Sequence, residues 1–185
     1  MKYPRPELRA GLILACFAIP LTVGCVHKIH VTPSPPIVTQ KPIPHSLRVV
    51  VPILAVEGAD HMPGIALFKW PANDLRTATM DYIEKRGTFS SVHEDQGKLT
   101  LTIKALLRMQ SRGKYRYLLR LESDLGPSAK TPIKSYLIEK DAVGSSVRWV
   151  TASDQDPIAE VVQAALDDLL LQIEGDAALY GGLPN

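Results

Sequence analysis

The chain has 185 residues, with 21 lysines and arginines against 19 acidic residues, and 45% of its residues are hydrophobic. Three of the basic residues and one acid lie within positions 1–24, so the remainder holds 18 of each sign and is formally neutral. A neutral chain lacks the basic surface that binds phosphate backbones, which argues against a nucleic-acid partner. Two cysteines, Cys16 and Cys25, are too few for a disulfide framework, so a hydrophobic core must stabilise the fold.

The first 24 residues have the features of an export signal peptide. Lys2, Arg5 and Arg9 precede an uncharged run from 10 to 23. This run of 14 residues contains Pro20, whereas a transmembrane helix needs about 20 apolar residues. The pattern therefore predicts a cleaved signal peptide rather than a permanent membrane span.

The uncharged run ends in the sequence Leu21-Thr22-Val23-Gly24-Cys25. This stretch resembles the lipobox of bacterial lipoproteins, in which a small residue precedes an acylated cysteine. Thr22 departs from the family's usual leucine. The resemblance covers the first 25 residues and implies cleavage between Gly24 and Cys25, a diacylglyceryl group on the Cys25 sulfur, and an acyl chain on the freed amine. An ordinary signal peptide with an incidental cysteine is the alternative.

Acylation would make Cys25 a durable membrane anchor. Each buried methylene contributes ~0.8 kcal/mol, and two or three acyl chains hold far more firmly than one. Val26 stands where an aspartate would, in the family, favour the inner membrane. The resemblance therefore implies a lipoprotein of the outer membrane that faces the periplasm.

Residues 25–46 are expected to tether the anchor to a folded domain. Five prolines fall between positions 33 and 44, and proline favours an extended backbone of ~3.1 Å per residue, so such a segment could reach roughly 60 Å. A proline-rich docking motif is the alternative. His27 and His30 have the spacing of a metal pair, but no neighbouring acid or cysteine completes a ligand set, so no metal or cofactor is expected.

The elements of the following domain, 47–175, can be taken in chain order. Residues 47–56 predict a strand in which Pro52 marks an edge, a bulge or the end of pairing. The segment 57–70 is irregular and is a candidate contact surface. Residues 74–86 predict a helix that Asn73 caps and Gly87 ends. A short strand is expected at 88–92.

The clearest pattern is a strict alternation of apolar and polar residues in two neighbouring runs. Residues 99–109 and 115–122 each alternate, with the turn 111–114 between them, and together predict an antiparallel hairpin. Further strands are expected at 133–139 and 147–150. A helical stripe at 158–173 follows an Asp156 cap and ends before Gly175, and 176–185 is expected to be a flexible tail.

This order predicts an α+β domain with a mostly antiparallel sheet of about five strands and two helices packed on one face. The order resembles that of small envelope lipoproteins, namely activators of peptidoglycan synthases, curli-secretion lipoproteins and auxiliary lipoproteins of ABC transporters. The resemblance implies an accessory role in a cell-envelope complex, but it carries over no functional residue.

The sequence holds no recognised catalytic motif. Ser91 and His93 are conceivable as a catalytic pair, although a solvated turn is the simpler interpretation. A basic strip of Lys104, Arg108, Arg116 and Arg120 on the wet side of the hairpin could contact an acidic partner or a lipid headgroup, or simply keep the sheet soluble.

The function that best fits these observations is a non-catalytic accessory or binding module of an envelope complex for transport, secretion or cell-wall synthesis. A carrier lipoprotein for a small ligand or lipid is the first alternative. A hydrolase that uses Ser91 and His93 is the second.

Overall fold

The computed structural model describes residues 25–58, 66–112, 114–144 and 155–182. The expected signal peptide, Gly24 and the expected strand at 147–150 lie outside these residues. The described elements are β1 (Cys25–Lys28), β2 (Ile43–Gly58), β3 (Ala66–Lys69), α1 (Ala72–Arg86), β4 (Phe89–His93), β5 (Leu99–Arg112), β6 (Lys114–Gly126), β7 (Lys134–Val143), α2 (Gln155–Gly175) and α3 (Ala177–Gly181).

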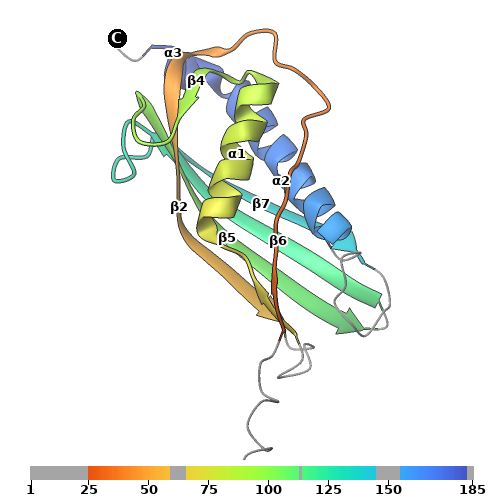
Figure 1. The fold of residues 1–185 in the computed structure, drawn as a ribbon. Helices are drawn as coiled ribbons and strands as arrows, with labels where there is room; N and C mark the ends of the chain where they lie inside the picture. The colour runs from red at the N-terminus through yellow and green to blue at the C-terminus, as the bar shows by residue number, and fades with distance from the viewer. Residues whose placement is uncertain (1–24, 59–65, 113, 145–154, 183–185) are drawn as a thin grey trace, which may run out of the picture.

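The main sheet has five strands in the order β4-β2-β5-β6-β7 (Figure 1). Strand β2 pairs in parallel with both β4 and β5, whereas β5, β6 and β7 pair antiparallel. The sheet is therefore mixed, and the prediction of a mostly antiparallel sheet was wrong. The reason is that α1 carries the chain from β2 back to the same end of the sheet before β4 begins, and such a crossover makes the strands parallel.

The hairpin predicted at 99–122 is confirmed as β5 and β6, which are paired from Thr100–Gly126 to Arg112–Lys114. Strand β2 is longer than expected, and its pairing with β5 is irregular between Val50 and Ile53. Pro52 lies in this irregularity, because it has no N–H to donate to a neighbouring strand. Of the edge, the bulge and the end of pairing expected at Pro52, the structure has the bulge, since pairing with β5 continues to Gly58.

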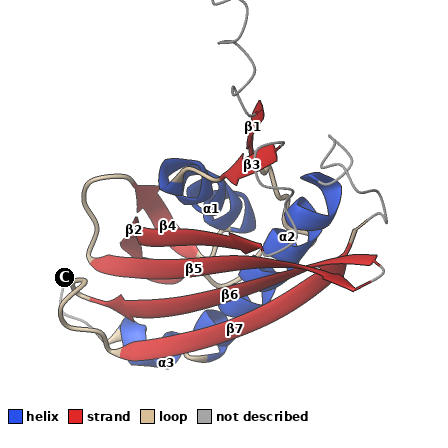
Figure 2. Cartoon of the chain, turned by 90° about the horizontal axis from the view of Figure 1, so that it is seen from below, coloured by secondary structure: helices blue, strands red, loops and turns tan. Residues whose placement is uncertain are grey.

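Helix α1 contacts β2 and β4, and α2 contacts β6 and β7. Both helices lie on the same side of the sheet, and the view of Figure 2 looks onto its other side. The core lies between the two layers, where alternate strand residues meet the helices. Its members include Leu47, Val49, Leu101, Ile103, Leu107, Leu119, Leu121, Ile138, Leu75, Ile83, Val162, Leu166 and Leu169.

The carboxyl end of α1 follows the prediction, whereas the two expected amino-terminal caps and the expected tail differ. Asp156 lies in the first turn of α2, which begins at Gln155, so it is not the cap of this helix. Gly87 ends α1 in a left-handed conformation at φ 74°, as predicted. The Asn73 cap was wrong, since α1 begins at Ala72 and the Pro71 carbonyl accepts the N–H groups of Asp74 and Leu75. The expected flexible tail instead contains α3, which buries Tyr180 and bonds its hydroxyl to that of Tyr136 at 2.5 Å.

A second, two-stranded sheet lies outside the main one. Strand β1 pairs in parallel with β3, from Cys25–Ala66 to Lys28–Lys69, and Figure 2 shows the pair beside α1. Part of the irregular segment expected at 57–70 is therefore strand. No helix of the described residues is both long enough and apolar enough to cross a membrane.

Candidate functional sites

The proline-rich segment is not a free tether in the structure. Residues 29–43, here called the N-terminal strap, lie along the domain, and Ile29, Val31 and Ile43 are each only 2% exposed. The Ile29 N–H donates to the Lys69 carbonyl at 2.9 Å. An extended backbone has no internal hydrogen bonds, so its N–H groups must find partners elsewhere once they are covered.

Side chains of the two long helices accept two of these N–H groups. Asp74 on α1 contacts the His30 ring and accepts the Val31 N–H at 3.4 Å. Gln163 on α2 accepts the Ser34 N–H at 3.5 Å. The expectation of a spacer over 25–46 missed this docking, because the prolines indicate an extended backbone and not where that backbone lies.

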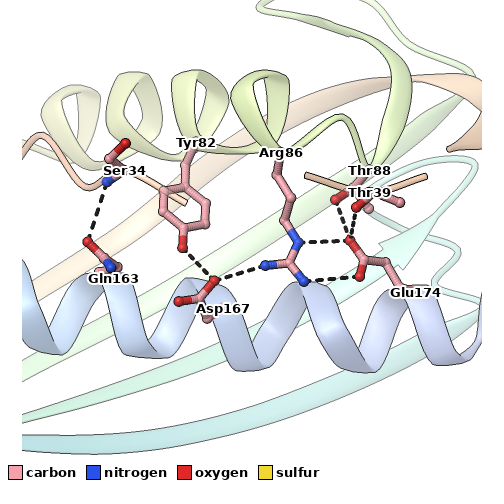
Figure 3. Close-up of polar contacts among 8 residues, drawn as sticks. All are labelled: Ser34, Thr39, Tyr82, Arg86, Thr88, Gln163, Asp167 and Glu174. Carbon is pink, nitrogen blue, oxygen red and sulfur yellow. Dashed lines mark hydrogen bonds and ion pairs between the residues drawn. The ribbon is translucent and has the colours of Figure 1, made fainter. Parts of the chain in front are cut away.

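The far end of the strap is held by a buried polar cluster (Figure 3). Arg86, which is 1% exposed, donates two hydrogen bonds to Glu174 at 2.8 and 3.0 Å and one to Asp167 at 2.9 Å. Tyr82 donates to the same Asp167 oxygen at 2.6 Å. The strap joins through Thr39, whose hydroxyl donates to Glu174 at 2.6 Å and whose N–H donates to the Arg86 carbonyl at 2.7 Å.

The interactions within this cluster keep Glu174 and Arg86 charged and Tyr82 neutral. Burial by itself would raise the pKa of the Glu174 carboxyl, but hydrogen bonds from Arg86 and two threonines outweigh burial and hold that pKa below its usual value. Burial raises the pKa of Tyr82, and the bond to Asp167 adds to this effect. The hydrogen bonds to Glu174 likewise raise the pKa of Arg86. The cluster therefore links α1 to α2 through the ion pairs of Arg86 and holds the strap through the hydrogen bonds of Thr39.

Sequence reasoning missed this cluster. The sequence places Arg86 only as the last residue of the helix predicted at 74–86, and its carboxylate partners lie 81 and 88 residues away. In the sequence, apolar Ile29 and Val31 alternate with polar residues, and this pattern was a sign that the strap packs against the domain.

The four residues of the predicted basic strip share one face of the hairpin. Lys104 and Arg108 on β5 lie opposite Glu122 and Leu118 on β6. Arg116 and Arg120 are two residues from these partners along β6, so they lie on the same face. We call this side, which the helices leave uncovered, the open face. Its arginines are paired with acids. Arg108 contacts Glu57 at 2.9 Å, Arg116 contacts Asp141 at 3.3 Å, and Arg120 contacts Glu122 at 2.8 Å and Glu139 at 3.4 Å. The open face therefore carries mixed charges.

Apolar side chains lie among these ion pairs. Ile53, Leu137 and Val143 are between 52% and 54% exposed, and Leu106 and Leu118 are half-buried. A surface groove of about 330 Å³ crosses the strands, lined by Leu106, Arg108, Gln110, Leu118, Leu119, Arg120, Glu139, Lys140 and Asp141. Apolar groups within a polar rim are typical of protein contact surfaces. The charged lining does not suit the acyl chain of a carried lipid.

The candidate catalytic pair lies elsewhere, on the short edge strand β4. Ser91 and His93 are within hydrogen-bond distance at 3.0 Å, and His93 is exposed. A catalytic triad also requires a carboxylate that accepts a hydrogen bond from the other nitrogen of the histidine ring. Among the described residues, no carboxylate bonds His93 in this way. Within 25–58, 66–112, 114–144 and 155–182, no three potential ligands gather into a metal site.

Similar proteins are found among solved structures and not by sequence comparison. No family model matches the sequence, and no curated protein matches it significantly. Protein XCC0632 from Xanthomonas campestris, of the DUF330 family, aligns with a TM-score of 0.57 and 18% identity over 83% of this chain and 98% of its own. This similarity shows a shared fold.

Two further solved structures align less closely. A minor lipoprotein from Acinetobacter baumannii has a TM-score of 0.49 at 12% identity, over 71% of this chain and 93% of its own. A candidate lipoprotein from Caulobacter crescentus CB15 has a TM-score of 0.44 at 13% identity, over 73% of this chain and 93% of its own.

Proposed function

We propose that this protein is a lipoprotein of the bacterial cell envelope, anchored by acyl chains on Cys25, and that it serves as a non-catalytic binding module for an envelope protein complex. The observation that carries the binding role is the open face of the sheet. One face of the sheet is buried under α1 and α2, whereas the other presents half-exposed apolar residues within a rim of ion pairs.

The anchor is supported by the lipobox-like stretch that ends in Gly24 and Cys25. Val26 after the cysteine favours the periplasmic side of the outer membrane. A complex for transport, secretion or cell-wall synthesis would fit that location. The fold shared with a DUF330 protein is compatible with this role and specifies no partner.

The open face offers contacts that a protein partner can use. Leu137 and Val143 lie on the edge strand β7. On their side of the strand, Leu137 lies between Ser135 and Glu139, and Val143 follows Asp141. Fully burying an exposed leucine or valine side chain contributes about 1.5–3 kcal/mol, and because these two are already half covered, an interface would gain roughly half of that from each. The ion pairs around them are half-exposed, so they contribute little to stability and are free to exchange partners on binding.

Two matched leucines allow a direct test in intact cells. A photoreactive amino acid would replace Leu137 on the open face or, as the control, Leu171 on α2; these side chains are 54% and 55% exposed. We expect one envelope protein to crosslink reproducibly from position 137 and not from 171. Equal adducts from both positions, or none from 137, would refute the open face as the contact surface.

The anchor has its own test. Mass spectrometry of the amino-terminal peptide from purified membranes should find a chain that begins at Cys25 and carries acyl groups. A mature chain that begins elsewhere, or an unmodified Cys25, would overturn the proposed attachment.

A further inference from the structure

We infer that the end of the domain formed by β1 and β3 rests directly on the bilayer and binds anionic phospholipid headgroups through Lys28 and Lys69. This inference rests on the proposed acylation of Cys25. It replaces the expectation of a domain held far from the membrane with one of a domain seated on it.

The distance between the anchor and the folded domain is short. Cys25 is the first residue of β1, which pairs with β3 along its whole length. Ile29 follows directly, is 2% exposed and bonds to the Lys69 carbonyl at 2.9 Å. A strand rises about 3.3 Å per residue, so roughly 13 Å separate Cys25 from this buried residue. Acyl chains on Cys25 would therefore draw β1 to the headgroups.

Lys28 and Lys69 place two positive charges side by side where β1 and β3 end. Lys28 and Lys69 are register partners on neighbouring parallel strands, and both are exposed. Neighbouring strands lie about 4.8 Å apart, and like charges directly opposite one another repel. Over the described parts of the chain, neither lysine forms an ion pair with a carboxylate, whereas Arg108, Arg116 and Arg120 each do. An anionic headgroup beside both lysines would relieve their repulsion.

The shape of the domain is compatible with this orientation. Figure 1 places the start of β1 and the end of β2 at one end of the molecule, together with the end of β5 and the start of β6, and it places α3 and the carboxyl terminus at the other end. A domain standing on the β1 end would direct the opposite end away from the bilayer. The open face would then rise from the membrane surface, where a protein partner could reach it.

Energy transfer to a membrane dye can measure this orientation. The full chain would be expressed, and the processed protein reconstituted into vesicles of phosphatidylcholine, alone or mixed with phosphatidylglycerol. Acylation of Cys25 and removal of Cys16 leave the mature chain without a free thiol, so one introduced cysteine can carry the donor dye. Asn73→Cys reports the start of α1 near β3, and Ser90→Cys reports β4; both positions are exposed.

We expect much stronger transfer from position 73 than from position 90, and a larger difference between the two when phosphatidylglycerol is present. The variant Lys28→Gln with Lys69→Gln should reduce that enhancement, because each lysine that is lost lowers the equilibrium constant for the seated orientation by roughly fivefold. The matched control is Lys98→Gln with Lys130→Gln, which removes two exposed lysines elsewhere and should leave the enhancement unchanged. Circular dichroism would establish that all variants are folded.

The outcomes separate this inference from the proposed function. Protein that fails to associate with any vesicle would refute the acyl anchor itself. Protein that associates but gives equal transfer from both probes would refute the seated orientation and leave the anchor intact. Energy transfer that does not change when phosphatidylglycerol is added, or that falls equally in the control variant, would refute the role of the lysine pair.

Discussion

Replacing Arg86 with methionine should destabilise the domain more than any single change on its open face. The methionine can fill much of the space of the arginine stem, but it leaves Asp167 and Glu174 without their cation. Both carboxylate side chains are only about a fifth exposed, at 23% and 21%. Removing one partner of a buried ion pair costs about 3–5 kcal/mol, and because water still reaches these carboxylates we expect the lower end, about 3 kcal/mol.

That loss is large beside the ~5–15 kcal/mol that stabilises a typical domain. For a domain of this size, 1 kcal/mol shifts Tm by about 2–4 °C, so Arg86→Met should lower Tm by roughly 6–12 °C. Thermal and urea unfolding followed by circular dichroism would measure both quantities. Urea unfolding should show the same loss through a lower midpoint at an unchanged slope.

Arg108→Met is the matched control, because it removes the same side chain from an ion pair whose members are 52% and 53% exposed. An exposed pair contributes about 0.2–1 kcal/mol, so its Tm should fall by no more than about 4 °C. If the two variants lose the same stability, the buried cluster does not hold the helices and the strap together.

Three further outcomes follow from the same structure. The pKa of Glu174 is lower in the folded state than its usual 4.5, so its contribution is complete above that pH and is lost as the pH falls through the folded pKa; Glu174→Gln should therefore flatten the acid limb of a stability profile. Thr39→Val removes one bond to Glu174 and should speed hydrogen exchange in the strap while leaving β5 protected, and unchanged exchange would contradict the docking. Gly97→Ala would place a methyl group 2.4 Å from the backbone nitrogen of Arg48 and should lower Tm measurably. An unchanged Tm would mean that the backbone around Gly97 moves aside at little cost.

The strands and helices were readable from local patterns. A period of two predicted β5 and β6, and a period near four predicted α1 and α2, because each pattern reports which side of an element is buried. Gly87 and Gly175 were expected near helix ends and are found there. These features depend on residues close together in the chain, so the sequence is sufficient to reveal them.

Strand direction, in contrast, could not be read from these patterns. An alternating strand buries the same side chains whether its neighbour is parallel or antiparallel. Only the α1 crossover decides that β2 runs parallel to β4 and β5. The mixed charge of the open face has a similar origin, since Arg108 meets Glu57 through strand pairing across 51 residues.

The sequence by itself determined the composition of the core, the hairpin, the two long helices and the lipobox-like stretch that ends at Cys25. Tertiary structure alone decided that the proline-rich strap docks on the domain, that Arg86 is buried against two carboxylates, and that Cys25 begins a paired strand. The physical reason is that periodicity and capping act within a few residues, whereas a buried N–H or guanidinium is satisfied by whichever distant group the folded chain brings to it.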